Sequence, residues 1–66
     1  MRHIHSATNG DYTAKVYYDR EWEEYVVKFY YQNKPLGADA HYHTDDKEDA
    51  IKTGTMQLLK YSRRGH

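Results

Sequence analysis

Two histidines and two aspartates, all residue types that bind metals, lie close together in the sequence. His41 and His43 are spaced to lie on one face of a β-strand, because alternate side chains of a strand point to the same side. Asp39 belongs to the same row and Asp45 follows closely, so a site of histidine and carboxylate ligands is one interpretation. The spacing fixes no third ligand. We therefore predict no metal and no cofactor, and we interpret both histidines as polar residues at the rim of a binding surface.

Residue patterns that support catalysis are missing from the sequence. There is no cysteine, no glycine-rich phosphate-binding loop and no nucleophile-elbow motif. The acidic pairs Asp45-Asp46 and Glu48-Asp49 fall at a predicted helix start, where carboxylates complement the helix dipole. A chain of 66 residues also leaves little room for a ligand cleft of about 300 Å³ or more. We predict that the protein is not an enzyme.

Basic and aromatic residues alternate in a way that is typical of single-strand nucleic-acid binding. They are Lys15, Tyr17, Trp22, Lys28 and Tyr30. Bases stack on aromatic side chains of this kind while lysines contact the phosphates. Against this function, Glu24 and Asp39 are predicted on the same face, and ten basic residues are balanced by ten acidic ones. Nucleic-acid binding is therefore the alternative function.

Composition indicates one small domain in the cytoplasm. A chain of this length without cysteines must be held by a single core, to which its eight tyrosines contribute most of the aromatic area. No apolar run approaches the roughly 18 residues of a membrane span, and residues 1–10 lack the apolar segment of a signal peptide. We expect no membrane partner and a cytoplasmic location.

The run from Trp22 to Tyr31 predicts a long β-strand, which we expect to be the central strand of the sheet. Its odd row is aromatic or β-branched apart from one glutamate, and is predicted to face the core: Glu23, Tyr25, Val27, Phe29 and Tyr31. Its even row mixes aromatic and charged residues on the other face: Trp22, Glu24, Val26, Lys28 and Tyr30. Alternation also predicts strands over residues 12–18 and 38–43, joined through Asp19-Arg20-Glu21 and a turn at 32–37.

A helix is predicted after the third strand, with Thr44 as its N-cap and Gly65 at its end. Its inward stripe consists of Ala50, Ile51, Gly54, Thr55, Leu58 and Ser62, with Leu59 adjacent. Because glycine costs about 1 kcal/mol in a helix interior, Gly54 indicates a close approach of the helix backbone to the tyrosines of the sheet. The predicted fold class is α+β, a three-stranded antiparallel meander with one C-terminal helix on one face. Residues 1–10 are expected to form a flexible arm, 11–62 the β-β-β-α domain and 63–66 a basic tail.

One helix can cover only one face of this sheet, so the other face is left to bind. We expect Tyr17, Trp22, Val26 and Tyr30 to form an apolar contact patch. The predicted polar rim consists of Lys15, Lys28, His41 and His43. Neither predicted edge strand carries a proline or a row of lysines, so edge pairing into a homodimer is a second mode of association.

Residues 25–61 resemble the strand-strand-helix portion of the double-stranded RNA-binding domain. That family holds phosphates with a Lys-Lys-x-Ala-like motif at the start of its last helix, where this chain has Lys47-Glu48-Asp49-Ala50. One lysine and the alanine match, an acid replaces the second lysine, and the family's N-terminal helix has no counterpart. The order of elements also resembles the arm-binding domains of phage integrases.

The runs VYYD, YVVKFYY and HTDDKEDAI resemble short uncharacterised proteins of tailed bacteriophages. This resemblance implies a host-takeover or anti-defence role, in which the protein modulates or inhibits a host protein by binding it. If the protein is phage-encoded, the expected location is the host cytoplasm. Together with the open aromatic face, it leads to the main functional expectation, a non-catalytic protein-interaction domain.

Overall fold

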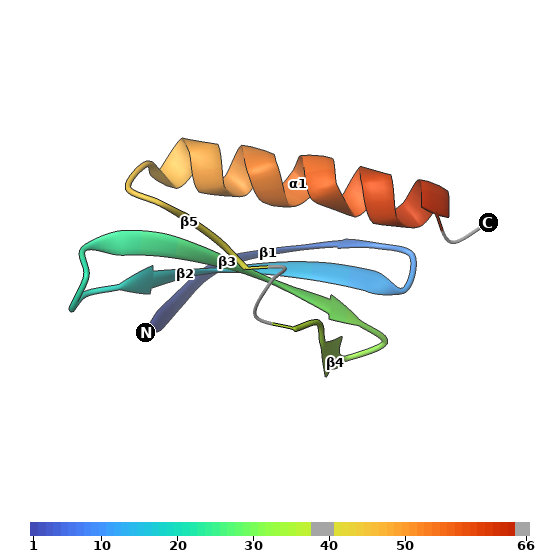
Figure 1. The fold of residues 1–66 in the computed structure, drawn as a ribbon, viewed down its shortest axis with the longest axis horizontal. Coiled ribbons are helices and arrows are strands. Elements are labelled where there is room, and N and C mark those ends of the chain that lie inside the picture. Colours follow the sequence, from blue (N-terminus) through green and yellow to red (C-terminus); the bar gives the residue numbers. More distant parts are fainter. Residues whose placement is uncertain (38–40, 65–66) are drawn as a thin grey trace.

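The computed structural model describes residues 1–37 and 41–64, with side chains described up to residue 61. One antiparallel sheet carries a single helix, α1 (Lys47–Arg64), on one face (Figure 1). Its strands are β1 (Arg2–Asn9), β2 (Tyr12–Asp19), β3 (Glu24–Tyr31), β4 (Lys34–Pro35) and β5 (Tyr42–Thr44). The first three form a meander, and β4 and β5 pair with opposite ends of β3 along its other edge. The predicted α+β class, a meander with a C-terminal helix, is confirmed.

The N-terminal residues form a strand, and the predicted flexible arm is wrong. Strand β1 pairs antiparallel with β2 through a two-residue loop in which Gly10 has a φ of 63°. A shift of register between His3 and His5 marks a β-bulge. Because of this bulge, Ile4 and Ala7 both pack against the core although they are three residues apart. The strand therefore lacks the two-residue alternation by which the others were identified.

The ends of the other strands also differ from the prediction. Strand β3 begins at Glu24, because residues 20–23 form a turn that places Trp22 outside the sheet. The backbone N–H groups of Glu21 and Trp22 donate to Asp19 Oδ1 at 3.0 and 3.4 Å, and Glu23 has a φ of 50°. The strand predicted over 38–43 is the shorter β5, and residues 38–40 lie outside the described residues.

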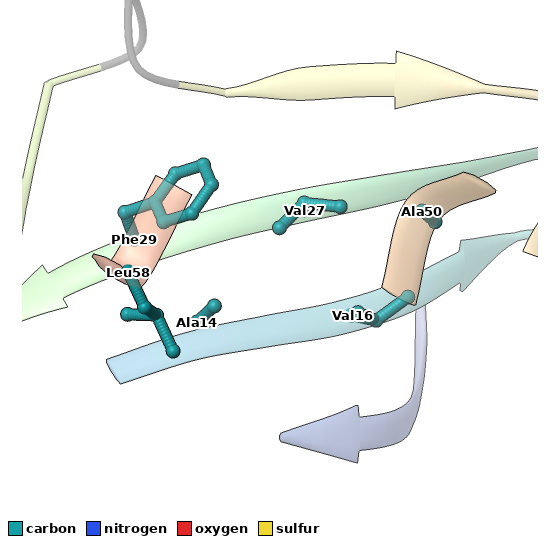
Figure 2. Close-up of a cluster of buried hydrophobic side chains, with 6 residues drawn as sticks. All are labelled: Ala14, Val16, Val27, Phe29, Ala50 and Leu58. Atoms are coloured by element: carbon teal, nitrogen blue, oxygen red, sulfur yellow. The ribbon is translucent and has the colours of Figure 1, made fainter. Parts of the chain in front are cut away.

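The core lies between α1 and the helix-facing rows of β2 and β3 (Figure 2). Its buried members are Ala14, Val16, Val27, Phe29, Ala50 and Leu58. These strand residues are the ones that alternation predicts to face inward. Tyr61, which was not predicted to face the sheet, stacks on Tyr12 with ring centroids 5.1 Å apart and meets the Phe29 ring edge-on.

Helix α1 begins two residues later than its predicted N-cap implies. Asp46 caps it, because Asp46 Oδ1 accepts hydrogen bonds from the N–H groups of Glu48 and Asp49 at 2.9 and 3.3 Å. Thr44 instead belongs to β5, where it pairs with Tyr25 and its hydroxyl accepts a bond from the Asp46 N–H at 3.3 Å.

The helix approaches the sheet closely at Gly54. A Cβ atom at this position would lie 3.3 Å from Val27 Cγ1 and 3.4 Å from Ala14 Cβ. The predicted close approach is therefore present, but it is made to these small core residues and not to tyrosines. Thr55, predicted to face inward, is exposed and its hydroxyl donates to the Ile51 carbonyl at 3.0 Å, while the Ser62 side chain lies outside the described part of the chain.

A hydrogen bond from β5 to α1 makes stability depend on pH. The Tyr42 hydroxyl donates to Asp49 Oδ2 at 2.6 Å. This bond lowers the pKa of Asp49 below its ordinary 3.8 and raises the pKa of Tyr42 above its ordinary 10.0. The stabilisation is therefore complete between these two pH values. It is lost as the pH falls through the folded-state pKa of Asp49, and again as it rises through that of Tyr42.

We expect Tyr42→Phe to lower the melting temperature at pH 7 and to have progressively less effect below pH 4, because protonated Asp49 no longer gains from the bond. Thermal melts of both proteins between pH 2 and 8 measure this difference. Tyr31→Phe is the matched control, since Tyr31 is exposed. If the difference in melting temperature between the wild-type protein and Tyr42→Phe stays constant down to pH 2, the bond does not favour the ionised carboxylate of Asp49.

Candidate functional site

Helix α1 covers one face of the sheet and leaves the opposite face uncovered (Figure 1). Pairing of β2 with β3 brings two rows of side chains together on it. In sequence order they are Thr13, Lys15, Tyr17, Glu24, Val26, Lys28 and Tyr30. Ser6 and Thr8 of β1 and His43 of β5 extend these rows at either side. We call this surface the open face.

Four residues at the centre of the open face interlock, and we call them the Tyr–Lys lattice: Lys15, Tyr17, Lys28 and Tyr30. Lys15 and Lys28 lie directly opposite each other on β2 and β3. Lys15 Nζ lies 4.8 Å from the centroid of the Tyr30 ring, and Lys28 Nζ lies 5.2 Å from that of Tyr17. Each such cation–π contact contributes about 0.5–1 kcal/mol at an exposed site, which offsets the repulsion between the two ammonium groups.

The hydroxyl ends of the lattice also interact. The nearby Tyr17 hydroxyl raises the pKa of Tyr30, partial burial adds to this effect, and the charges of Lys15 and Lys28 oppose it. Tyr30 therefore stays neutral at physiological pH and can both donate and accept a hydrogen bond. The lattice thus offers two phenols and two ammonium groups within one small area.

Two members of the predicted contact patch are not available on the open face. Val26 lies on this face but is only 1% exposed, since it is flanked by Tyr17 on β2 and His43 on β5. Trp22 is 73% exposed, but it belongs to the turn before β3 and not to the sheet. The four residues predicted as one apolar patch are therefore separated. Of these four, only Tyr17 and Tyr30 are accessible on the open face.

The histidines occupy different surroundings. His43 lies on the open face, with its Nδ1 2.9 Å from Glu24 Oε1, whereas His41 precedes β5 and is partly buried. His3 of β1, which was not predicted as a site residue, packs against Tyr17 with ring centroids 5.3 Å apart. Within residues 1–37 and 41–61, no three histidine or acidic residues gather in a way that could hold a metal ion.

An open cleft of about 640 Å³ lies at one end of the sheet. Met1 and Arg2 line it from the start of the chain, and Tyr18, Arg20 and Glu23 line it from the β2–β3 hairpin. No pattern in the sequence indicates this cleft, because the N-terminal residues that form one of its walls were expected to be a flexible arm. It is larger than the space expected for a domain of this size.

Comparisons with known proteins add no further constraint. No protein-family model, no curated protein and no solved structure matches the chain. Within the described residues, α1 is not apolar enough to cross a membrane.

Proposed function

We propose that this protein is a non-catalytic interaction domain that binds another protein through the Tyr–Lys lattice on its open face. The observation that supports the proposal is the gathering of two tyrosines and two lysines on a sheet face that α1 does not cover. Tyrosine is enriched at binding hot spots because it combines apolar area with a polar end.

The charges of the lattice indicate the chemistry of the partner. Lys15 and Lys28 face each other without an acidic residue between them, and Glu24 is engaged by His43. A partner that brings a carboxylate to the two ammonium groups would relieve their repulsion, and apolar groups beside it would pack on the tyrosine rings. We therefore propose a partner surface that combines acidic and apolar side chains. The resemblance to short phage proteins suggests a host protein that this domain modulates or inhibits.

The protein-binding proposal is tested by comparing what the intact domain and its variants capture. Tyr17→Ala/Tyr30→Ala is expected to lose the captured protein, while Tyr31→Ala, an exposed tyrosine outside the lattice, retains it. Titration of the captured protein into isotope-labelled domain should then shift the amide signals around the lattice. Capture that survives the double substitution, or signal shifts confined to α1, would contradict the proposal.

Single-stranded nucleic acid is the second candidate, and the specific observation in its favour is the pair of lysines held over aromatic rings. It ranks second because the ammonium groups already occupy the ring faces on which bases would stack. If two lysines neutralise two phosphates, the salt slope is about −1.4, so a fourfold rise in salt lowers the affinity about sevenfold. Fluorescence anisotropy with a 12-nucleotide single strand at 50 and 200 mM salt measures this change. Binding of that kind, lost in Lys15→Ala/Lys28→Ala, would favour this candidate over protein binding.

A further inference from the structure

The outer edge of β1 is the longest strand edge that the described part of the sheet leaves unpaired. The opposite edge, along β3, is occupied by β4 and β5, and the Leu36 N–H donates to the Phe29 carbonyl at 2.9 Å between them. Strand β1 runs from Arg2 to Asn9 and contains neither proline nor lysine, the residues that usually protect an edge from pairing.

The hairpin geometry determines which backbone groups of β1 face outward. Asn9 and Tyr12 flank a two-residue loop, so they form a hydrogen-bonded pair. Because the two kinds of pair alternate along an antiparallel ladder, Ala7 and Ala14 form the next hydrogen-bonded pair. Ser6 and Thr8 lie at the positions between, and their N–H and C=O groups point away from β2.

We infer that the protein forms a two-fold homodimer in which β1 pairs antiparallel with β1 of a second copy, with Ala7 at the two-fold axis. In this register, Ser6 of one copy exchanges backbone hydrogen bonds with Thr8 of the other, and the reverse. Ala7 then faces its own equivalent in a non-hydrogen-bonded pair, where Cα atoms approach to about 4.5 Å. Its small side chain fits this close approach, and the uncharged hydroxyls of Ser6 and Thr8 meet on the open face.

The helices do not obstruct this dimer. Helix α1 packs chiefly over β2, with β1 and β3 at its sides. Since neighbouring strands lie about 4.8 Å apart, the two copies of β2 would be about 14 Å apart, with β1 and its equivalent between them. Packed helices need only about 8–10 Å between their axes. The two helices therefore lie side by side without overlap and cover Ile4 and Ala7, which are only partly buried in one copy.

The same features limit the assembly to two copies. The bulge between His3 and His5 interrupts the regular edge, so pairing is confined to residues 5–9. Each copy uses its β1 edge once, and β4 and β5 occupy the far edge of each sheet. The symmetry is therefore closed. The inference does not rest on the proposed function, because β1 contributes none of the four lattice residues.

The oligomeric state and the register are tested separately. Sedimentation equilibrium of the wild-type chain between 1 and 500 μM is expected to show twice the monomer mass. Thr8→Pro removes an outward N–H without removing a bond to β2, and is expected to sediment as a folded monomer, whereas Thr8→Ala keeps the N–H and remains a dimer. A wild-type chain that is monomeric over this whole range would overturn the inference.

Engineered cysteines test the register even if Thr8→Pro fails to fold. The chain has no native cysteine, so any disulfide is unambiguous. Ala7→Cys is expected to cross-link within the dimer under mild oxidation, because the paired Cα atoms lie within disulfide range. Thr8→Cys is expected to cross-link much more slowly, because Thr8 faces Ser6 of the other copy. Equal cross-linking rates, or faster cross-linking of Thr8→Cys, would overturn the proposed pairing.

Discussion

Phe29→Ala is expected to lower the free energy of unfolding by about 3–5 kcal/mol, enough to leave much of the population unfolded. The Phe29 ring is 2% exposed and lies in the core between β3 and α1, where Tyr61 meets it edge-on. Removing it takes away apolar contacts and leaves a cavity that the surrounding β-strands cannot fill. Urea unfolding followed by circular dichroism measures the loss.

Tyr30→Ala is the matched control for this substitution, because Tyr30 is the next residue of β3 and points to the open face. It removes the contact with Lys15 and a cross-strand neighbour, so we expect a loss of about 1 kcal/mol. Similar losses in the two variants would show that the faces of β3 are not divided between core and surface as described. A far smaller loss in Phe29→Ala would place the core elsewhere.

Gly54→Leu is expected to cost about 3 kcal/mol, because it places a large side chain where α1 touches the sheet. Even a Cβ atom here would lie 3.3 Å from Val27 Cγ1 and 3.4 Å from Ala14 Cβ. Both neighbours are buried and belong to paired central strands, so neither can move aside without disturbing the sheet. A thermal melt should show a fall of about 12–24 °C for a domain of this size.

Two variants separate steric overpacking from other effects of replacing Gly54. Gly54→Ala gains about 1 kcal/mol of helix propensity, and the new Cβ contacts require only a small adjustment of the neighbouring side chains. Because these two effects oppose each other, we expect a change in melting temperature close to zero. Thr55→Leu places the same side chain on the next, exposed residue and should change the melting temperature by only a few degrees. A stabilised Gly54→Leu variant would contradict the close packing of α1 on β2 and β3.

The central part of the fold was predictable because its patterns are uninterrupted. Along β2 and β3, every second residue from Tyr12 and from Tyr25 is apolar or aromatic, so the inward positions of Val16, Val27 and Phe29 followed from the period of two. The inward faces of Ala50 and Leu58 likewise followed from helical spacing. Tyr61 could have been found in the same way, since it lies seven residues after Gly54.

The incorrect predictions arose where local chemistry or distant pairing overrides a pattern. The bulge in β1 hides its alternation, although Asn9-Gly10 is itself a hairpin signal. Trp22 continues the strand pattern, but the Asp19 side chain turns the backbone before it. Val26 is buried because β5 pairs with β3 beside it, and the sequence of β3 alone does not predict this pairing.

Because successive residues of β2 and β3 point to opposite faces of the sheet, adjacent residues have different structural roles. Every second side chain, such as Val16 and Val27, packs beneath the helix, while intervening ones such as Lys15 and Lys28 lie on the face that the helix leaves uncovered. Substitutions at the exposed outward positions should therefore unfold the protein less readily than substitutions at the helix-facing ones, whereas Val26 is an outward position that is buried. Divergent descendants of this chain should keep the helix-facing positions of each strand and change the exposed positions between them.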